Sequence, residues 1–469
     1  MIDYSVKARL DAIIAVQRSA YLADGPPTAA TRANRLERAA VMLIQAGEEI
    51  AATVSQDFGY RSSDETRLEI FGAVVALRAA AAKVEVWMEP AIHPALALGA
   101  EARVEHVPLG VVGVMGAWNY PIVTIFAPLA GILAAGNRAV IKPSENAPGM
   151  AALVDRLISE TFAQSEVATV QGGAEEARHF ASAPFDHLIF TGSTAVGQQV
   201  MRAAADNLTP VTLELGGKSP VVIDSDYPIA DAAEKVIAVK ARNAGQICLA
   251  PDYALVPAGR ERAFAEHCVA AARRMFPQGA ASKDYSSIIS NRHLTRLKEM
   301  LADATAKGGE LIEVFPAGEE SPGRYLNPVI VLNARPDMQV MSEEIFGPIL
   351  PVVGYRSLDD VLADLRSKPH PLALYYFGLD EARTRKVLGG TASGGVTIND
   401  VMTHAMAEDL PFGGVGSSGM GFYRGEAGFL TFSHARAIYR QSPAREAAAL
   451  FYPPYGEPLR SFLSGALAR

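Results

Sequence analysis

Residues 111–142 carry the stretch that decides the fold, VVGVMGAWNYPIVTIFAPLAGILAAGNRAVIK. Val111–Met115 is a short apolar run, typical of a strand that is buried on both faces. Pro121–Ala135 has the length and apolar character of a buried helix, and Gly136-Asn137 is a typical helix stop. Arg138–Lys142 then begins a second strand. A strand, a helix and a strand in this order predict a parallel β-α-β unit.

The alternation of strands and helices continues beyond this unit. Further strands are expected at Val167–Gln171, His187–Phe190, Val211–Glu214, Val221–Ile223, Glu344–Tyr355 and Gly395–Ile398, and helices at Pro148–Thr161, Ile229–Asn243 and Arg260–Met275. The first 90 residues have helical spacing of apolar residues. The Gly- and Ser-rich segment Pro411–Gly425 is expected to be a folded loop. The predicted fold class is therefore α/β, with a doubly wound parallel sheet followed by a second α/β unit.

Composition excludes several classes of protein. The chain has 469 residues, of which 49% are hydrophobic and 20% charged, as in a globular protein of two or three domains. The net charge of −8 and the lack of a basic stripe argue against binding of nucleic acid. Asp3, Lys7 and Arg9 interrupt any apolar signal sequence. The most apolar window, Phe126–Gly136, is too short for a bilayer, which needs about 20 residues.

The two cysteines have different surroundings. They are too few for a disulfide scaffold, so a reducing, cytoplasmic location is expected. Cys268 lies in a predicted helix, as a small buried apolar residue would. Cys248 lies between Gly245 and Pro251, in a constrained turn. A turn at a domain boundary can present a reactive thiol, so Cys248 is the candidate nucleophile.

Glu214 is the candidate base. The nine histidines are scattered, none is tied to Cys248 by a motif, and no pair has the HExxH pattern of a zinc site. Glu214 ends an apolar strand and precedes Gly216-Gly217. A carboxylate in such a place is either paired structurally or has a raised pKa that suits a base. Gly217-Lys218-Ser219 resembles the end of a P-loop, but Thr212 stands where the first glycine is required.

Two segments suggest a dinucleotide site. Thr191–Gly197 joins a strand to a helix, and its glycines allow a phosphate to approach the helix N-terminus. Lys142 and Glu145 follow a strand, where such side chains can reach ribose hydroxyls. Each segment also has an ordinary interpretation, as a simple turn and as a solvated ion pair. The usual GxGxxG signature is absent.

Taken in order, these motifs resemble those of the aldehyde dehydrogenase superfamily. The matching pieces are Trp118-Asn119-Tyr120-Pro121, Lys142-Pro143-Ser144-Glu145, Phe190-Thr191-Gly192-Ser193, Glu214-Leu215-Gly216-Gly217-Lys218, Gly245-Gln246-Ile247-Cys248, Glu343-Glu344-Ile345-Phe346-Gly347-Pro348 and Pro411-Phe412-Gly413-Gly414. Finer features are similar to the class 3 branch, and within it to bacterial coniferyl aldehyde dehydrogenases; they are Ala250-Pro251-Asp252-Tyr253, Gly416–Gly421, Thr431-Phe432-Ser433-His434 and Tyr452-Pro453-Pro454-Tyr455.

The resemblance implies a role for each residue that matches a motif. Cys248 would be the nucleophile, Glu214 the base that activates a water molecule, and Asn119 an oxyanion donor. The residues implied for binding of NAD or NADP are Trp118, Lys142, Ser144, Glu145, Gly192, Ser193, Gly197, Leu215, Glu344 and Phe346. Tyr120 and Ile247 would line a tunnel for the substrate, and neither has a charge. No metal is implied.

The resemblance also implies a domain organisation. Residues 1–93 and 109–213 would bind the cofactor and 214–405 would carry the catalytic domain. Residues 94–108 and 425–445 would form bridging strands, and 446–469 a C-terminal tail. The alternating segment Arg103–Val107 is interpreted as an exposed edge strand that a second subunit covers, which predicts a homodimer.

The expected reaction is oxidation of an apolar or aromatic aldehyde, with coniferyl aldehyde as the favoured substrate. A medium- or long-chain aliphatic aldehyde is an alternative, because an apolar tunnel suits it equally. A CoA-acylating dehydrogenase is disfavoured because such enzymes resemble this pattern without the glutamate at position 214. A non-catalytic structural relative is disfavoured because Cys248, Glu214 and Asn119 are all present.

Overall fold

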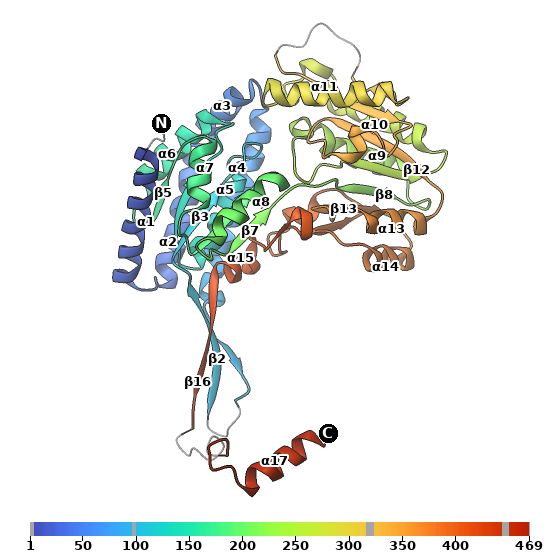
Figure 1. Cartoon of the computed structure of the whole chain (residues 1–469). Helices are drawn as coiled ribbons and strands as arrows, with labels where there is room; N and C mark the ends of the chain where they lie inside the picture. Colours follow the sequence, from blue (N-terminus) through green and yellow to red (C-terminus); the bar gives the residue numbers. More distant parts are fainter. Residues whose placement is uncertain (1–3, 96–99, 316–322, 443–449, 469) are drawn as a thin grey trace.

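The computed structural model describes residues 4–95, 100–315, 323–442 and 450–468. Within them the strands form three sheets, of six, seven and three strands. Figure 1 shows the two larger sheets with their helices side by side, and the small sheet as a narrow arm that projects from them. The positions 96–99, 443–449 and 469 of the predicted bridging strands and tail lie outside the described residues.

The six-stranded sheet contains the stretch that opened the sequence analysis. Its order is β15 (Gly419–Met420), β7 (Val211–Glu214), β6 (His187–Thr191), β3 (Val111–Met115), β4 (Arg138–Lys142) and β5 (Val167–Thr169). All neighbours are parallel except β15, which runs antiparallel to β7. The chain leaves β3 to one side, through β4 and β5, and returns to the other side of β3 with β6. This reversal creates a crevice beyond the carboxyl ends of β3 and β6, where doubly wound folds bind ligands.

Helices cover both faces of this sheet. The connecting helices are α5 (Val123–Ala134), α6 (Pro148–Thr161), α7 (Ala174–Ala181) and α8 (Thr194–Ala205), and four further helices precede the sheet: α1 (Tyr4–Asp24), α2 (Ala29–Gln45), α3 (Gly47–Phe58) and α4 (Ser63–Trp87). Leu10, Ile13 and Ile14 of α1 pack with residues of β3, β4, α7 and α8 in one apolar cluster. Helices α2 to α6 pack in another cluster, on the opposite face. The predicted doubly wound sheet is confirmed.

The seven-stranded sheet forms the second α/β unit. Its order is β10 (Glu310–Glu313), β11 (Val329–Leu332), β12 (Ile349–Tyr355), β9 (Tyr253–Pro257), β8 (Pro220–Ile223), β13 (Ala373–Phe377) and β14 (Gly395–Ile398), parallel except between β10 and β11. Its helices are α9 (Ile229–Ala241), α10 (Glu261–Met275), α11 (Asn291–Ala306), α12 (Gln339–Ser342), α13 (Leu358–Ser367) and α14 (Glu381–Gly390). Short 3-10 turns η1 (Arg242–Gly245), η2 (Gly279–Ala281) and η3 (Thr403–Met406) lie between them.

Several sequence predictions were wrong in detail. Helix α9 ends at Ala241 rather than Asn243, because Asn243 and Ala244 have left-handed φ of 48° and 49° that no right-handed helix accommodates. The strand expected from Glu344 begins only at Ile349. The segment Pro411–Gly425 is not all loop, since it contains η4 (Gly416–Ser418) and β15, which pairs with β7.

The arm consists of β1 (Ala91–His93), β2 (Glu101–Pro108) and β16 (Ser433–Arg440). Strand β2 pairs antiparallel with both others, and β1 covers only Ala102–Val104, so the prediction that Arg103–Val107 is an edge strand was wrong for Arg103 and Val104; the outer strands of the sheet are β1 and β16. At the base of the arm, Asn137 accepts hydrogen bonds from Leu109 N (2.7 Å) and Gly110 N (2.9 Å) and donates to Phe432 O (2.7 Å). Helix α15 (Gly425–Thr431) precedes β16, and α17 (Glu457–Leu467) lies at the far end of the arm (Figure 1).

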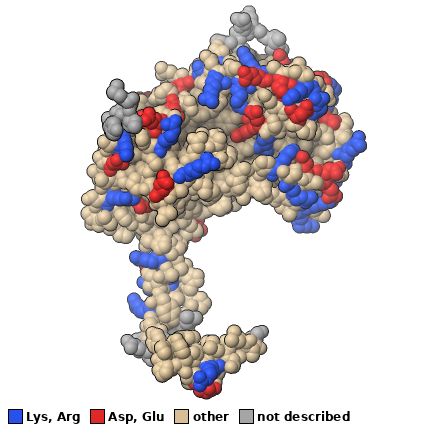
Figure 2. All heavy atoms as spheres, in the orientation of Figure 1, with Lys and Arg blue, Asp and Glu red and all other residues tan. Residues whose placement is uncertain are grey.

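The surface on the face in view in Figure 2 carries charges of both signs. Figure 2 shows acidic and basic side chains interspersed over the two larger units on the face in view, without a continuous basic groove. No helix in the described part of the chain is long and apolar enough to cross a membrane.

Candidate active site

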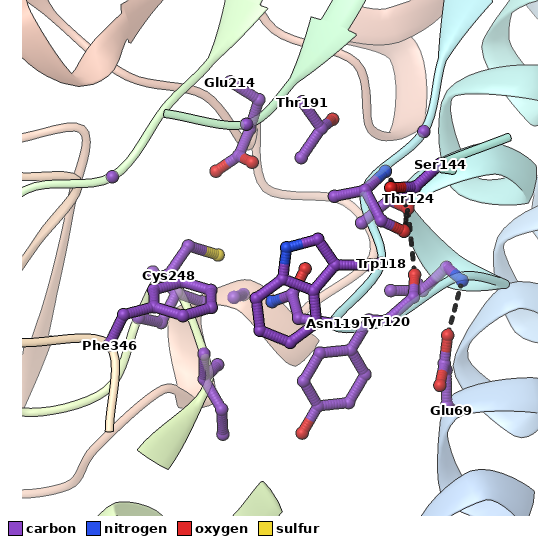
Figure 3. A pocket seen from close by; sticks show the side chains of 18 of the residues that line it. Glu69, Trp118, Asn119, Tyr120, Thr124, Ser144, Thr191, Glu214, Cys248 and Phe346 are labelled. Carbon is purple, nitrogen blue, oxygen red and sulfur yellow. Dashed lines mark hydrogen bonds between the residues drawn. The ribbon is translucent and has the colours of Figure 1, made fainter. Parts of the chain in front are cut away.

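One cavity of about 660 Å³ lies beyond the carboxyl ends of β3 and β6, where the six-stranded sheet faces the seven-stranded one. It is lined by Met115 and Gly116 after β3 and by Thr191 and Gly192 after β6. Its wall includes all the site residues predicted from sequence except Gly197 and Leu215, namely Trp118, Asn119, Tyr120, Lys142, Ser144, Glu145, Gly192, Ser193, Glu214, Ile247, Cys248, Glu344 and Phe346 (Figure 3).

Cys248 follows a backbone of unusual shape. Asn243, Ala244 and Gly245 have consecutive positive φ values of 48°, 49° and 69°. A side chain at residue 245 would overlap the carbonyl oxygen of Gly347, so the turn requires glycine there. The tight turn directs the partly exposed thiol of Cys248 into the cavity, as Figure 3 shows. The predicted constrained turn is confirmed.

The surroundings of Cys248 favour the protonated form of its thiol. Burial raises its pKa well above the usual value, and the negative charges of Glu214 and Glu344 raise it further. A thiolate therefore needs a neighbouring proton acceptor or a nearby positive charge to form. Cys268 lies in α10, fully buried, with its thiol 3.6 Å from the carbonyl oxygen of Ala233.

Glu214 is the last residue of β7, and only 2% of its surface is exposed. Burial raises its pKa to about 8, and the charge of Glu344 adds to the shift, whereas the Cys248 thiol and Arg424 oppose it. Its Oε1 atom is buried and has no hydrogen-bond partner within the described residues. A structural carboxylate would be satisfied by a cation or by donors. Glu214 instead keeps an unused acceptor beside the thiol, which is the arrangement of a general base.

Asn119 lies at the start of the chain segment that follows β3. Its side-chain nitrogen donates to the carbonyl oxygen of Gln246 (3.1 Å), two residues before the thiol. The backbone carbonyl oxygen of Asn119 accepts hydrogen bonds from Arg61 Nη1 (3.2 Å) and Asn243 Nδ2 (3.1 Å). The amide group of Asn119 is therefore held against the turn that carries Cys248, where it can donate to an oxyanion formed on a thiol adduct.

Cys248, Glu214 and Asn119 line one half of the cavity. The other half, which is lined by Lys142, Glu145 and Ser193, suits a dinucleotide. Lys142 ends β4 and pairs with Glu145 across 3.1 Å, with Lys142 buried and the Glu145 side chain 42% exposed. Ser193 caps α8 by accepting a hydrogen bond from Val196 N (3.4 Å), so the positive end of this helix faces the cavity. Carboxylate and ammonium groups at a strand end fit ribose hydroxyls, and a helix N-terminus fits a pyrophosphate.

Gly197 and Leu215 do not form part of the cavity wall. They pack against each other: a Cβ atom on Gly197 would lie 2.7 Å from Leu215 Cδ2. Gly197 therefore allows α8 to approach β7 closely, and Leu215 fills the space between them.

An aromatic group lies between the two halves of the cavity. The Trp118 ring lies 5.5 Å from the ring of Phe346 and 5.2 Å from that of His293. Phe346 has a left-handed φ of 47°, and strain of this kind gathers at functional sites. Glu344 accepts a hydrogen bond from Gly217 N, and burial together with the charge of Asp252 raises its pKa to about 7. A side chain at residue 216 would overlap this carboxylate, so it would displace Glu344 from its present position.

Several residues of the wall were not predicted from the sequence. Arg242 and Arg424 bring charge into a tunnel that was predicted from Tyr120 and Ile247 to be apolar. Other missed residues come from α4 and from the segment around η3; they are Leu68, Phe71, Gly72, Val75, Met402, Met406 and Glu408. Leu68 and Phe71 are large apolar residues that lie exposed on α4 and line the cavity, so they mark its entrance. Within the described residues no group of His, Cys, Asp and Glu is arranged to hold a metal ion.

Comparison with known proteins agrees with this geometry. The family model described as aldehyde dehydrogenase family matches residues 2–438. Coniferyl aldehyde dehydrogenase of a Pseudomonas species (strain HR199) is 50% identical over 455 residues, covering 96% of this chain and 95% of the relative. Aldehyde dehydrogenase family 3 member A2 of Mus musculus is 42% identical over 371 residues, covering 78% and 75%. The substrate-bound structure of Staphylococcus aureus AldH superposes with a TM-score of 0.91 at 33% identity, covering 97% and 99%.

Proposed function

Because the chain belongs to the aldehyde dehydrogenase family, we propose that it oxidises an apolar or aromatic aldehyde, with coniferyl aldehyde the first candidate, to the carboxylic acid. The cavity wall has residues that would hold NAD or NADP, which would supply the hydride acceptor. The observation that carries the proposal is that Cys248 and Glu214 line one cavity with the amide of Asn119, and that Glu214 Oε1 has no hydrogen-bond partner within the described residues.

The first step is the addition of the Cys248 thiol to the aldehyde carbon. The proton of the thiol is released to solvent as the sulfur bonds to the carbonyl carbon, and the carbonyl oxygen becomes an oxyanion. The Asn119 amide and the Cys248 backbone N–H then stabilise this charge. The product is a thiohemiacetal on Cys248.

The second step converts the thiohemiacetal to a thioester. A bound nicotinamide supplies the hydride acceptor for this oxidation. In this chain Lys142 and Glu145 would hold the adenosine ribose, Ser193 and Gly192 the pyrophosphate, and Glu344 and Phe346 the nicotinamide ribose and ring. Trp118 and Ser144 complete the wall of this half of the cavity. Gly197 and Leu215 would act only by supporting α8.

The third step releases the acid. Glu214 removes a proton from a water molecule, whose oxygen attacks the thioester carbon, and the Cys248 sulfur leaves. The sum of the steps is one aldehyde, one oxidised cofactor and one water converted to one acid, one reduced cofactor and one proton. The free Oε1 of Glu214 is the atom available to this water.

The substrate half of the cavity supports an apolar body with a polar end. Tyr120, Ile247, Phe412 and Met402 supply apolar wall, which favours aromatic and alkyl chains over charged ones. Arg242 adds polar groups that can meet the hydroxyl and methoxy groups of an aromatic ring. The 50% identity to a coniferyl aldehyde dehydrogenase favours that substrate over alkyl aldehydes.

The decisive experiment is kcat/KM for coniferyl aldehyde, hexanal, decanal and betaine aldehyde, measured from the absorbance of the reduced cofactor. We expect coniferyl aldehyde to be preferred. A preference for decanal would refute the aromatic assignment alone. A preference for betaine aldehyde would refute the apolar wall, and no reaction with any of the four would refute the proposed activity.

We further propose a cytoplasmic homodimer. Both cysteines are free, as a reducing location requires. The arm exposes two strand edges and the apolar side chains of Ile92 and Tyr439, which a second copy of the chain would cover. We also propose the domain boundaries predicted above, with 1–93 and 109–213 for the cofactor and 214–405 for catalysis.

A further inference from the structure

A buried carboxylate on α4 joins two segments of the cavity wall. Glu65 is 6% exposed and lies outside the wall itself. Its Oε1 accepts a hydrogen bond from the hydroxyl of Tyr120 (2.8 Å), and its Oε2 accepts one from Asn243 N (3.1 Å). Tyr120 directly follows Asn119, and Asn243 begins the turn that leads to Cys248. One side chain thus contacts both segments.

The two segments are also tied to each other. Asn243 Nδ2 donates to Asn119 O (3.1 Å) and to Gln246 O (3.3 Å), and Asn119 Nδ2 donates to Gln246 O (3.1 Å). The turn at Asn243, Ala244 and Gly245 is left-handed at three successive residues, which is unfavourable for Ala244. Strained backbone of this kind persists only when surrounding contacts hold it. The bond from Asn243 N to Glu65 is one of those contacts.

Cations compensate the buried charge of Glu65. Arg61 is fully buried, 3.1 Å from Glu69 and 4.0 Å from Glu65, and its guanidinium lies 4.6 Å from the centre of the Tyr120 ring. Arg242 lies 3.4 Å from Glu65 on the cavity side. Ser286 Oγ supplies a further hydrogen bond (3.3 Å). A carboxylate with this many partners keeps its geometry, because moving it would leave buried charges unpaired.

We propose that Glu65 is a positioning residue that sets the place of the Asn119 amide relative to Cys248, and so determines how well an oxyanion is stabilised. The inference rests on the proposed function, in which Asn119 is the oxyanion donor. Glu65 touches neither substrate nor cofactor. It acts by fixing Tyr120 on one side and Asn243 on the other.

The test compares Glu65→Gln, Asn119→Ala and the double variant in single-turnover formation of reduced cofactor. Glu65→Gln keeps the volume and removes the charge. We expect it to slow the single turnover roughly 10- to 100-fold, the size of effect that a small misplacement of reacting groups produces. Binding of the cofactor, followed by fluorescence, should be unchanged. Hydrolysis of an activated phenyl ester, which needs the oxyanion but no hydride transfer, should slow by the same factor.

The double variant separates positioning from other effects. If Glu65 acts through Asn119, Glu65→Gln in the Asn119→Ala background should cost less than about twofold more, because coupled residues are not additive. An additive loss would overturn the proposal, and so would an unchanged rate in Glu65→Gln. If the wild-type protein had no dehydrogenase activity, or if Asn119→Ala had no effect on the rate, the proposed function would be overturned instead.

Two further variants guard against a trivial loss of folding. Tyr120→Phe removes only the hydroxyl that donates to Glu65, and we expect a smaller loss with the same non-additivity. Glu166→Gln is the matched control: Glu166 is half-buried, paired with Arg35 (2.9 Å) and Arg38 (2.8 Å), and outside the cavity wall. It should lower the melting temperature without changing the single-turnover rate. If Glu166→Gln, with a similar fall in melting temperature, slowed the single turnover as much as Glu65→Gln does, the proposal would fail.

Discussion

Glu214 and Cys248 line the same cavity from two different sheets. Glu214 is the last residue of β7 in the six-stranded sheet, whereas Cys248 lies in the turn that leads to β9 of the seven-stranded sheet. Burial raises the pKa of the thiol and the charge of Glu214 raises it further, while Glu214 Oε1 is a buried acceptor without a partner in the described part of the chain. The chemistry of each therefore depends on the packing of the two units against each other.

We predict that Glu214→Gln stops the reaction after hydride transfer. The glutamine cannot take a proton from water, so the thioester on Cys248 should persist. Stopped-flow measurement should show a burst of reduced cofactor near one equivalent, followed by slow turnover, and mass spectrometry should detect the acyl group on Cys248. If burst and steady state fell together, Glu214 would act earlier, in activation of the thiol.

The pH dependence of turnover should follow the same carboxyl group. Burial raises the pKa of Glu214 to about 8, and only the carboxylate form can act as a base, so thioester hydrolysis should accelerate as pH rises through about 8. We expect kcat of the wild type to rise with pH through about 8, and kcat of Glu214→Gln to lack this rise. A wild-type profile that is flat through this range would contradict the assignment.

The same shift has a consequence for stability. The folded-state pKa lies above the unfolded value, so the folded protein binds the proton more tightly, and the free energy of unfolding falls as pH rises from about 4.5 through about 8. Glu214→Gln removes this dependence. The melting temperature of Glu214→Gln minus that of wild type should therefore be larger above pH 8 than at acidic pH.

Much of the fold could be predicted because its signals are local. Apolar runs of strand length alternate with longer helical segments, and β3, β4 and α6 begin and end where the sequence indicates. The errors arise where distant parts of the chain decide the outcome. Strand β2 pairs on both sides only because β16, more than 300 residues later, lies beside it. Likewise β15 exists because Gly419 meets Glu214.

The candidate site divides in the same way. Cys248, Glu214 and Glu145 stand in motifs with glycine or proline beside them, and so they were visible in the sequence. Arg242 and Glu65 stand in helical segments of ordinary pattern, and only the tertiary structure brings them together, across 3.4 Å. No local feature of α4 indicates that a glutamate there binds the turn before the thiol.

We predict that Cys248→Ala abolishes dehydrogenase activity and leaves the fold intact, since alanine fits a partly exposed position. Circular dichroism and steady-state assay check both statements. Cys268→Ala is the control: it removes a thiol from the interior of α10, which should lower stability modestly and leave kcat unchanged. Retention of a tenth of the wild-type rate in Cys248→Ala would refute the mechanism.

We predict that both NAD and NADP are used, and that Glu145 favours NAD. A carboxylate can accept hydrogen bonds from a ribose diol but repels a 2′-phosphate. The Glu145 side chain is 42% exposed, so breaking its ion pair with Lys142 would let it turn away from the phosphate. Glu145→Gln should raise the ratio of kcat/KM for NADP to that for NAD about tenfold, a change of about 1.4 kcal/mol. Strict dependence on NADP in wild type would contradict this role.

The final prediction is a homodimer formed through the arm. A narrow three-stranded sheet that projects from the body buries little on its own, and β1 is exposed at every residue. Light scattering should give twice the monomer mass of 49.8 kDa.

Ile92→Glu, which places a charge on a residue that is 77% exposed in the single chain, should shift the protein toward monomer. Leu208→Glu, at an 89% exposed position on the body, is the control and should leave the dimer intact. A monomeric wild type would refute the interface, and dissociation by Leu208→Glu rather than Ile92→Glu would move it from the arm to the body.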